Sequence, residues 1–343
     1  MSHRFSSEQI EVADSVEAVS DLFFKKGWTD GLPIIPPTQD AVFRMLAGTN
    51  RSATDVVSTI PPLRNEATVE SLAINAVMAG CLPEYLPILI AAITAMCEEP
   101  FNLNTMQTTT HPCSPLTIIN GPIIKNLNIN GKFGAFGSGW RSNATIGRAI
   151  NLILMNIGGA FPGKTDMSTQ SQPSKYAFCI AENEEDSPWE PLHIERGFAA
   201  SVSTVTVAIA ENPHNINDHH ATSAEEMLTT IAGTMTTLGN NDTQLRHGNP
   251  ILALSPEHAA TIAKDGFSKK DVKAYLYEKA RVSRRRFHER MSKAFFPNLE
   301  EDALIPMTAA KEDLVVIVVG GPGKHSSFLP SFGRGISITK AIQ

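Results

Sequence analysis

The sequence has few cysteines and no long apolar run. Its four cysteines, at positions 81, 97, 113 and 179, are too far apart for the Cys-x-x-Cys spacing of zinc and redox motifs. The longest strongly apolar run, residues 86–96, is far shorter than the roughly 20 residues of a membrane helix. The chain also opens without the basic and apolar regions of a secretory signal. We therefore expect a cytoplasmic protein with free thiols and no membrane partner.

Positive charge is scarce as well. The formal net charge is −6, and the one dense basic cluster, residues 281–286, lies in a helical pattern that also carries Glu278 and Glu289. Domains that bind nucleic acids usually show a basic face, so this balance argues against a nucleic-acid partner. With 42 % hydrophobic and 19 % charged residues, the 343-residue chain has the composition of a globular protein with a sizeable core.

Apolar periodicity and turn residues predict alternating helices and strands, which indicates an α/β or α+β fold with a mixed sheet and flanking helices. Glycines and prolines in residues 27–38 predict an ordered loop instead. We expect an N-terminal helical and proline-rich segment, residues 1–115, packed on a mixed α/β core, residues 116–343, as two domains or as one. The expected helices are 7–26, 39–47, 69–79, 143–156, 223–238, 257–264 and 269–291, and the expected strands are 116–122, 175–181, 203–210, 250–254 and 314–320.

The tetrapeptide Ile-Ala-Glu-Asn occurs twice, at residues 180–183 and 209–212. Each copy ends a predicted strand and is followed by a loop with proline and histidine. The repeat favours two related, pseudo-symmetric strand–loop units, with chance recurrence as the alternative. No period of the kind that marks a solenoid is present.

Cys81 stands where a helix is expected to begin. It is followed by Pro83 and Glu84, which suit a first helical turn, and then by the apolar run 86–96. Backbone N–H groups and the helix dipole favour a thiolate at such a position, and the thiolate is the nucleophilic form. The sequence therefore predicts a lowered pKa for Cys81 and a role as catalytic nucleophile. The alternative is a buried thiol that packs under the helix.

A second candidate segment brings His111 and Cys113 within two residues of each other, between prolines that exclude regular structure. An imidazole beside a thiol can act as its base or its ion-pair partner, so we expect both residues to be catalytic. Alternatively, the pair supplies half of a metal site completed by isolated histidines such as His193, His214, His219 or His220, although their spacing matches no known motif.

A glycine-rich loop, residues 131–139, leads into the predicted helix 143–156 and is the best anion-binding candidate. We expect Gly137, Gly139 and Arg141 to contact an anionic group, and Ser142 or Asn143 to cap the helix so that its first N–H groups face the ligand. The spacing fits neither the dinucleotide fingerprint nor the P-loop, so a nucleotide is not implied.

Carboxylates and a histidine follow the predicted strand 175–181, in the position where α/β sheets usually place their sites. Glu182 and His193 can serve there as acid and base, because contact between a carboxylate and an imidazole tunes both groups. The acidic run Glu184, Glu185 and Asp186 is expected to face solvent. A solvated acidic loop is the alternative for the whole segment.

The last predicted strand, residues 314–320, is followed by a glycine turn. Its β-branched residues predict a position inside the sheet, and backbone amides of Gly321 and Gly323 would then form a nest for an anion. The polar residues of the turn, expected to contact the same anionic group, are Lys324, His325 and Ser326.

Residues 27–38 and 320–327 together resemble segments of a bacterial family of UGSC (selenocysteine-Gly-Ser-Cys) proteins and their selenium-free relatives, with a looser likeness over residues 120–198. The resemblance implies thiol or selenol chemistry in a cytoplasmic bacterial enzyme. The chain contains no Cys-Gly-Ser-Cys tetrapeptide, so the resemblance assigns no catalytic role to Cys81 or Cys113.

These patterns favour an enzyme that acts on a small anionic substrate by cysteine-based chemistry, as a lyase, a hydrolase or in a reductive cleavage, without a cofactor and as a homo-oligomer. Cys81 would attack, His111 or His193 would move the proton, and Glu182 would orient the histidine. Arg141 and Lys324 would hold the substrate's anionic group. The alternatives are a binding protein or subunit of a larger assembly, and a metal enzyme that uses His111 and Cys113.

Overall fold

Two four-stranded mixed sheets lie at the centre of the protein, in the computed structural model, which describes residues 5–343. The strand order of the first sheet is β14 (Ile338–Ala341), β5 (Thr204–Ala210), β3 (Ser114–Asn120), β4 (Cys179–Ala181), and that of the second is β11 (Val315–Val318), β8 (Ile251–Leu254), β12 (His325–Leu329), β6 (His214–Asn217). Within the first sheet β3 and β4 are parallel and the other neighbours antiparallel; within the second, β11 and β8 are parallel and the others antiparallel. The mixed sheets with flanking helices match the predicted α/β or α+β class.

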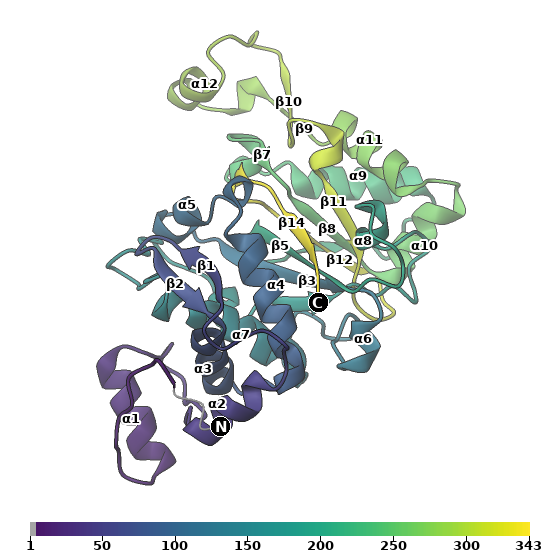
Figure 1. The fold of residues 1–343 in the computed structure, drawn as a ribbon. Coiled ribbons are helices and arrows are strands. Elements are labelled where there is room, and N and C mark those ends of the chain that lie inside the picture. Colours follow the sequence, from purple (N-terminus) through teal and green to yellow (C-terminus); the bar gives the residue numbers. More distant parts are fainter. Residues whose placement is uncertain (1–4) are drawn as a thin grey trace.

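The two sheets and their helices form four layers. Leu116 and Ile118 of β3 share one apolar cluster with Ile251 and Ile317 of the second sheet, so the sheets pack face to face. Figure 1 shows the two groups of helices on opposite sides of the strands. The first sheet is covered by α3 (Val69–Ala79), α4 (Leu86–Met96) and α7 (Arg141–Asn156), and the second by α9 (Ala224–Met235), α10 (Pro256–Lys264) and α11 (Lys269–Lys279).

This layering explains the composition of the central strands. Every residue of β3 and of β5 is buried, because one face of the sheet meets helices and the other meets the second sheet. A strand buried on both faces shows a continuous apolar run in place of strict alternation. The cluster that holds α3 and α4 also includes strand residues of the first sheet, while the domain boundary after residue 115 stays a prediction.

Local signals set several helix ends where the sequence predicted them. Helix α3 begins after the capping side chain of Thr68 and ends at Gly80, whose φ of 88° suits glycine, so the prediction 69–79 is confirmed. Thr38 caps α2 (Gln39–Leu46), as expected. Helix α1 (Val16–Lys26) starts later than predicted, because Ser15 is its cap and residues 5–14 form neither helix nor strand. The backbone N–H groups of Ser6 and Ser7 are instead bonded to the buried Glu70 of α3.

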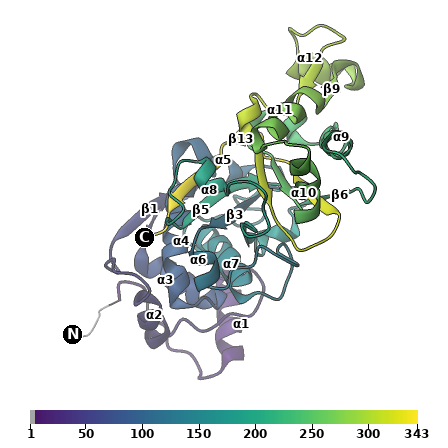
Figure 2. The same ribbon diagram turned by 90° about the vertical axis from the view of Figure 1, so that its right-hand side faces the viewer.

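The single helix expected over residues 269–291 is wrong. Helix α11 ends at Lys279, and the chain then forms β9 (Arg281–Ser283), the short helix α12 (Glu289–Phe295) and β10 (Leu304–Pro306). Strand β10 returns to pair with β9 in antiparallel direction. Val282 and Ile305 face each other in this pair and are both buried, so tertiary burial overrides the helical pattern. The basic cluster 281–286 therefore lies on β9 and a 3₁₀ turn. Figures 1 and 2 agree that the segment carrying α12 extends away from the sheets.

The expected interior position of the last predicted strand is also wrong. Strand β11 is the end strand of its sheet, and it is buried because the chain after β4 covers its free edge. Asn183 donates its backbone N–H to Val318 O over 2.8 Å, and Gly320 donates to Gly131 O over 2.8 Å. The carboxyl ends of β4 and β11 are thereby held together.

Shorter elements complete the fold. The two Ile-Ala-Glu-Asn copies end β4 and β5, which flank β3 in opposite directions, so Glu182 and Glu211 lie at opposite ends of β3. Within residues 5–343 no single helix is long and apolar enough to cross a membrane; only the pair 83–96 and 99–108, bent by 77°, meets the criteria jointly. The remaining elements are β1 (Val56–Ile60), β2 (Asn65–Thr68), α5 (Leu103–Thr108), α6 (Ile123–Asn126), α8 (Leu192–Glu195), β7 (His247–Gly248) and β13 (Arg334–Gly335).

Candidate active site

Two glutamates meet one asparagine at the carboxyl ends of β3 and β4. Asn120, the last residue of β3, donates from Nδ2 to Glu182 Oε2 over 2.6 Å and to Glu184 Oε1 over 2.9 Å. The backbone N–H of Gly121 also donates to Glu184 Oε1, over 2.8 Å. Glu182 and Glu184, which follow β4 in the chain, are thus fixed side by side, at the strand end where α/β sheets usually carry their sites.

Glu182 is a buried carboxyl, and its neighbours only partly offset the free-energy cost of ionising it there. Only 1 % of the residue is exposed. Burial raises the pKa of Glu182, while Lys269, the Leu192 N–H and Asn120 lower it and the neighbouring Glu184 raises it further; the net shift is upward. The ammonium of Lys269 lies 3.6 Å from Oε1, which is too far for a hydrogen bond. Glu182 therefore keeps its proton at a higher pH than an exposed glutamate.

Several buried polar atoms at this site have no hydrogen-bond partner among residues 5–343. They are Oδ1 of Asn120, Oε1 of Glu182 and both ring nitrogens of His193. His193 Nδ1 lies 3.6 Å from Glu184 Oε1, so a small movement brings the two into hydrogen-bond contact. Because unpaired buried polar groups cost free energy, such a concentration is expected where a ligand or a reaction supplies the partner.

A cavity of about 750 Å³ opens beside these carboxyls. Glu182 and Glu184 line it, together with Phe133 of the glycine-rich loop and Trp140, the residue directly before α7. At its rim Lys125 and Lys132 are both paired with the exposed Glu185, at 2.5 and 2.7 Å. The cavity therefore combines a buried acid, a second carboxyl, aromatic walls and a pair of cations.

Glycines allow the loop to approach this site closely. A Cβ on Gly131 would lie 2.6 Å from Ala181 O, directly before Glu182, and a Cβ on Gly321 would lie 2.3 Å from the ring of Phe133. Both contacts are shorter than real Cβ atoms make. The glycine-rich loop and the C-terminal glycine turn thus meet at Phe133, which lines the cavity, whereas Gly321 and Gly323 themselves do not line it.

Lys269 supports the site from the second helical layer. This buried residue of α11 faces Glu182 and also lies 3.5 Å from Glu195, which Lys273 contacts as well. The ion pairs tie α11 to α8 and hold the loop between β4 and α8. Sequence reasoning missed Asn120, Glu184 and Lys269; the position of Asn120 directly before Gly121 and Pro122, at the end of a predicted strand, was the one available signal.

The predicted lowering of the pKa of Cys81 is wrong. Burial raises the pKa of this thiol to about 12, and the hydrogen bond to Thr145 and the charges of Arg141 and Arg148 only partly oppose it. Cys81 follows the end of α3, where its N–H bonds to Ala76 O and its Sγ donates to Thr145 O over 3.3 Å. The thiol packs between α3 and α7, which is the alternative that the sequence left open.

Arg141 lies next to Cys81 but has a structural contact. Its Nε and Nη2 both donate to Gly80 O, at 3.2 and 3.0 Å, and so satisfy a carbonyl at the end of α3. Gly137 and Gly139 are exposed in the loop before α7. The predicted cap is wrong, because α7 begins at Arg141 with Trp140 as its cap.

Ser142 and Asn143 therefore have other functions than capping. Ser142 Oγ donates to Asn128 O, and Asn143 accepts from Asn130 N–H and donates to Asn130 O and Cys179 O. Asn143 is buried, and its amide joins α7 to the strand β4 and to the segment before the glycine-rich loop. It positions the wall of the cavity without lining it.

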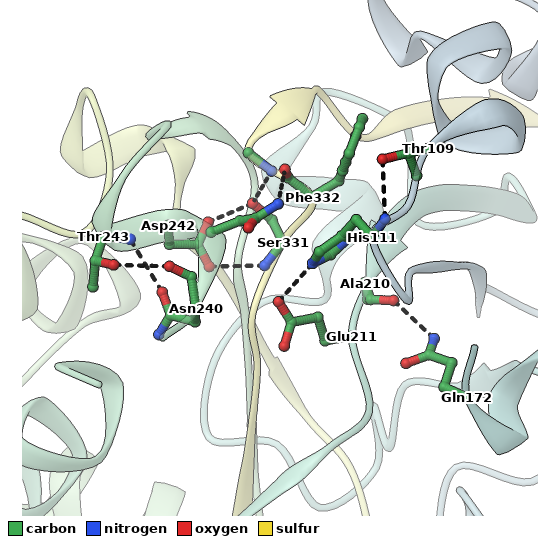
Figure 3. A network of polar contacts seen from close by, with 12 residues as sticks. Thr109, His111, Gln172, Ala210, Glu211, Asn240, Asp242, Thr243, Ser331 and Phe332 are labelled. Atoms are coloured by element: carbon green, nitrogen blue, oxygen red, sulfur yellow. Dashed lines mark hydrogen bonds and ion pairs between the residues drawn. The ribbon is translucent and has the colours of Figure 1, made fainter. Parts of the chain in front are cut away.

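His111 and Cys113 lie at the other end of β3. His111 Nε2 is 2.9 Å from Glu211 Oε1, and Figure 3 shows this pair facing each other. The strand between His111 and Asn120 spans roughly 20 Å at about 3.3 Å per residue, so His111 does not share a site with Glu182. Burial raises the pKa of Cys113 to about 12.

A second buried carboxyl lies in the same network. Asp242 accepts hydrogen bonds from the backbone N–H of Ser331, over 2.7 Å, and from its hydroxyl (Figure 3). Burial raises the pKa of Asp242 to about 7, and the two bonds to Ser331 only partly offset that effect. Asp242 ties the chain that follows β12 to the turn 241–243.

Of the polar residues predicted for the C-terminal turn, His325 and Ser326 belong to β12 of the second sheet, and Lys324 directly precedes it. Lys324 Nζ donates to His219 O over 3.0 Å, and the Nε2 atoms of His325 and His219 are 3.3 Å apart. Ser326 is buried and its Oγ contacts His258 Nδ1 and the N–H of Ser255. Gly323 has a φ of 141°, in the region that favours glycine. Lys324, His325 and Ser326 do not line the cavity beside Glu182.

No group of three or more His, Cys, Asp or Glu side chains in residues 5–343 is arranged to hold a metal ion. The structure brings together Glu182, His193 and the two glycine segments. It places Cys81 with Arg141, His111 with Glu211, and Lys324 with His219 elsewhere.

Comparisons of the chain with protein families, with characterised proteins and with solved structures gave no match.

Proposed function

We propose that the protein is an enzyme that moves protons on a small substrate bound beside Glu182, as a lyase or a hydrolase. The observation that carries the proposal is the buried Glu182 carboxyl, with its raised pKa, on the wall of a 750 Å³ cavity next to a second carboxyl. Two carboxyls in different environments are the usual equipment for acid and base chemistry in one site. Glu182 is the acid in this assignment.

Glu184 is the base. It is partly exposed to the cavity, and His193 lies close enough to take over its proton after a small movement. In a lyase Glu184 removes a proton from substrate carbon, the bond to the leaving group breaks, and the leaving group takes its proton from Glu182. In a hydrolase Glu184 instead takes the proton from the attacking water. Both reactions use the same pair of carboxyls.

An anionic group on the substrate is supported by Lys125 and Lys132 at the rim. Both are exposed and paired with Glu185, and exposed pairs exchange readily for a ligand anion because they contribute little stability. The high pKa values of Cys81 and Cys113 do not support a thiolate nucleophile, so the thiol chemistry implied by the UGSC resemblance is not part of the proposal. The four free cysteines favour a reducing compartment such as the cytoplasm.

Deuterium exchange tests the proposal. Native protein is incubated in D₂O with a panel of small carboxylates, hydroxy acids and phosphate esters, and proton NMR follows loss of substrate C–H signals and appearance of products. We expect turnover of at least one class, and a loss of about 100-fold or more in Glu182→Gln and Glu184→Gln. Glu190→Gln is the matched control, because Glu190 is an exposed glutamate of the same loop that does not line the cavity. Full activity in Glu182→Gln would remove Glu182 as the acid.

A further inference from the structure

A second and larger cavity, of about 860 Å³, lies at the opposite end of β3 from Glu182. Cys113 and Pro115, at the amino end of that strand, form part of its wall. The ordered loop that contains Gly27 and Gly31 forms another part, together with side chains of α5 and α7. Its volume is within the range of small-molecule sites, which is roughly 300–1,000 Å³.

Four amide side chains line this cavity. Gln170 is exposed, and three others from separate segments are buried: Gln107, Asn151 and Gln172. They are only 3 %, 8 % and 8 % exposed. Each uses its NH₂ group on a backbone carbonyl, of Pro61, Gly147 and Ala210 respectively. The amide oxygens of the three side chains therefore stay available to accept hydrogen bonds from a ligand. Oε1 of Gln107 is buried with no partner in the part of the chain that the structure describes.

The charges that line the cavity are already balanced. Asp166 is paired with Lys175 at 2.5 Å, and Asp30 is held by two hydrogen bonds of 2.8 Å from Arg148. Cys113 is a neutral thiol, because burial raises its pKa to about 12. A charged ligand would therefore find no uncompensated charge on the wall, and its desolvation would cost free energy.

Much of the remaining wall is apolar. Two aromatic and three flexible aliphatic side chains suit a flat apolar body: Phe24, Phe161, Met106, Leu154 and Met155. Thr29, Ser171 and Tyr176 also line the cavity. A ligand that fits must present hydrogen-bond donors to the amide oxygens and apolar surface to the rest of the wall.

From this arrangement we infer that the cavity binds a neutral small molecule that carries amide N–H donors on an apolar ring, such as an aromatic carboxamide or a cyclic amide. The N–H groups of the ligand supply the donors that Gln107, Asn151 and Gln172 lack. Lys175 also lines the cavity, and its ammonium group is the hydrogen-bond donor that we assign to the ligand's carbonyl oxygen. This inference does not depend on the function proposed for Glu182, since the two cavities lie at opposite ends of β3.

Calorimetric titration with benzamide and with benzoate tests the inference. The two probes have the same ring and nearly the same shape, but benzoate has no N–H donor and carries a charge. We expect benzamide to bind and benzoate to bind at least about tenfold more weakly, the difference that one good hydrogen bond makes. Native protein and the variants below are compared under the same conditions, with Glu182→Gln included to show that the first cavity plays no part.

Asn151→Leu is the informative variant. Gly147 O remains satisfied by the helix when this amide is removed, so the fold is retained while the acceptor is lost. Thr94→Val is the matched control, since Thr94 also uses its side chain only on the carbonyl four residues earlier and does not line the cavity. Weaker benzamide binding in Asn151→Leu alone supports the site. No binding of benzamide at millimolar concentration, equal binding of benzoate, or unchanged affinity in Asn151→Leu would overturn it.

Discussion

Asn120 and Glu182 are joined by a hydrogen bond of 2.6 Å between the carboxyl ends of two parallel strands. The same NH₂ group also reaches Glu184, so one amide sets the distance between the proposed acid and base. Oδ1 of Asn120 has no partner in residues 5–343. Asn120 is therefore a positioning residue, and its substitutions separate the electrostatics of the site from its packing.

Asn120→Asp is expected to destabilise the protein more at pH 8 than Asn120→Leu does. Either change removes the donor, which costs about 1–3 kcal/mol for a buried carboxyl, but aspartate adds a negative charge beside the carboxyls of Glu182 and Glu184. Chemical denaturation at pH 8 and at pH 5 measures the difference. It should shrink at the lower pH, where the carboxyls take up protons; a difference that does not depend on pH would contradict the electrostatic account.

Asp242 gives the fold a pH dependence of known sign. Its pKa of about 7 in the folded protein lies above the ordinary 3.8, so the folded state binds this proton more tightly between those values. The contribution of Asp242 to the free energy of unfolding therefore falls as pH rises from about 4 to about 7, by up to about 4 kcal/mol. Asp242→Asn should flatten this part of the stability profile. Identical pH profiles for the two proteins would show that Asp242 titrates normally.

Alkylation should distinguish the cysteines by burial. Cys81, Cys113 and Cys179 are buried, and burial raises the pKa of each thiol, to about 12 for the first two, whereas Cys97 is partly exposed. We expect iodoacetamide at pH 7 to modify Cys97 first and the other three only after unfolding. Peptide mass spectrometry gives the site of modification. Fast labelling of Cys81 in the native protein would restore it as a candidate nucleophile.

Two helical glycines, one closely packed and one in open space, allow a test of how closely α7 packs. A Cβ on Gly147 of α7 would lie 2.5 Å from the backbone N of Phe178, whereas a Cβ on Gly233 of α9 meets nothing within 4 Å. Gly147→Ala should therefore destabilise the protein by about 1–3 kcal/mol, and Gly233→Ala should stabilise it by roughly 0.5–1 kcal/mol. Thermal melts of both variants measure this. Equal effects would show that α7 does not pack closely on the chain before β4.

The sequence predicted those parts of the fold that depend on neighbouring residues. Helix 69–79 was predicted to the residue, because Thr68 and Gly80 supply both of its end signals locally. The break after Lys279 was missed, because it depends on Val282 pairing with Ile305, more than twenty residues later. The start of α7 was placed two residues late, because Ser142 and Asn143 resemble caps but bond to residues outside the helix.

The same limit applies to the candidate site: the sequence predicts residues whose position depends on neighbouring residues, and misses those that only the fold brings together. Glu182 was found from its position directly after a strand. Glu184 looked like part of a solvated acidic run, and only the fold brings it to Asn120 and Gly121, more than sixty residues earlier. Cys81 is not at the start of an α-helix, because α4 begins only at Leu86 after a short 3₁₀ turn, and burial between α3 and α7 raises the pKa of its thiol. The helix dipole is local in sequence, whereas desolvation depends on the whole packing.

The pKa of Glu182 is the quantity on which the proposed function depends most directly. Infrared spectra of the native protein and of Glu182→Gln, recorded between pH 4 and pH 9, isolate this carboxyl as a difference, which also removes the signal of Asp242. We predict that the band of a protonated carboxyl persists in the native protein well above the ordinary pKa of 4.5 and is absent from the variant. A Glu182 that loses its proton at or below 4.5 would contradict its assignment as the acid, and with it the proposed function.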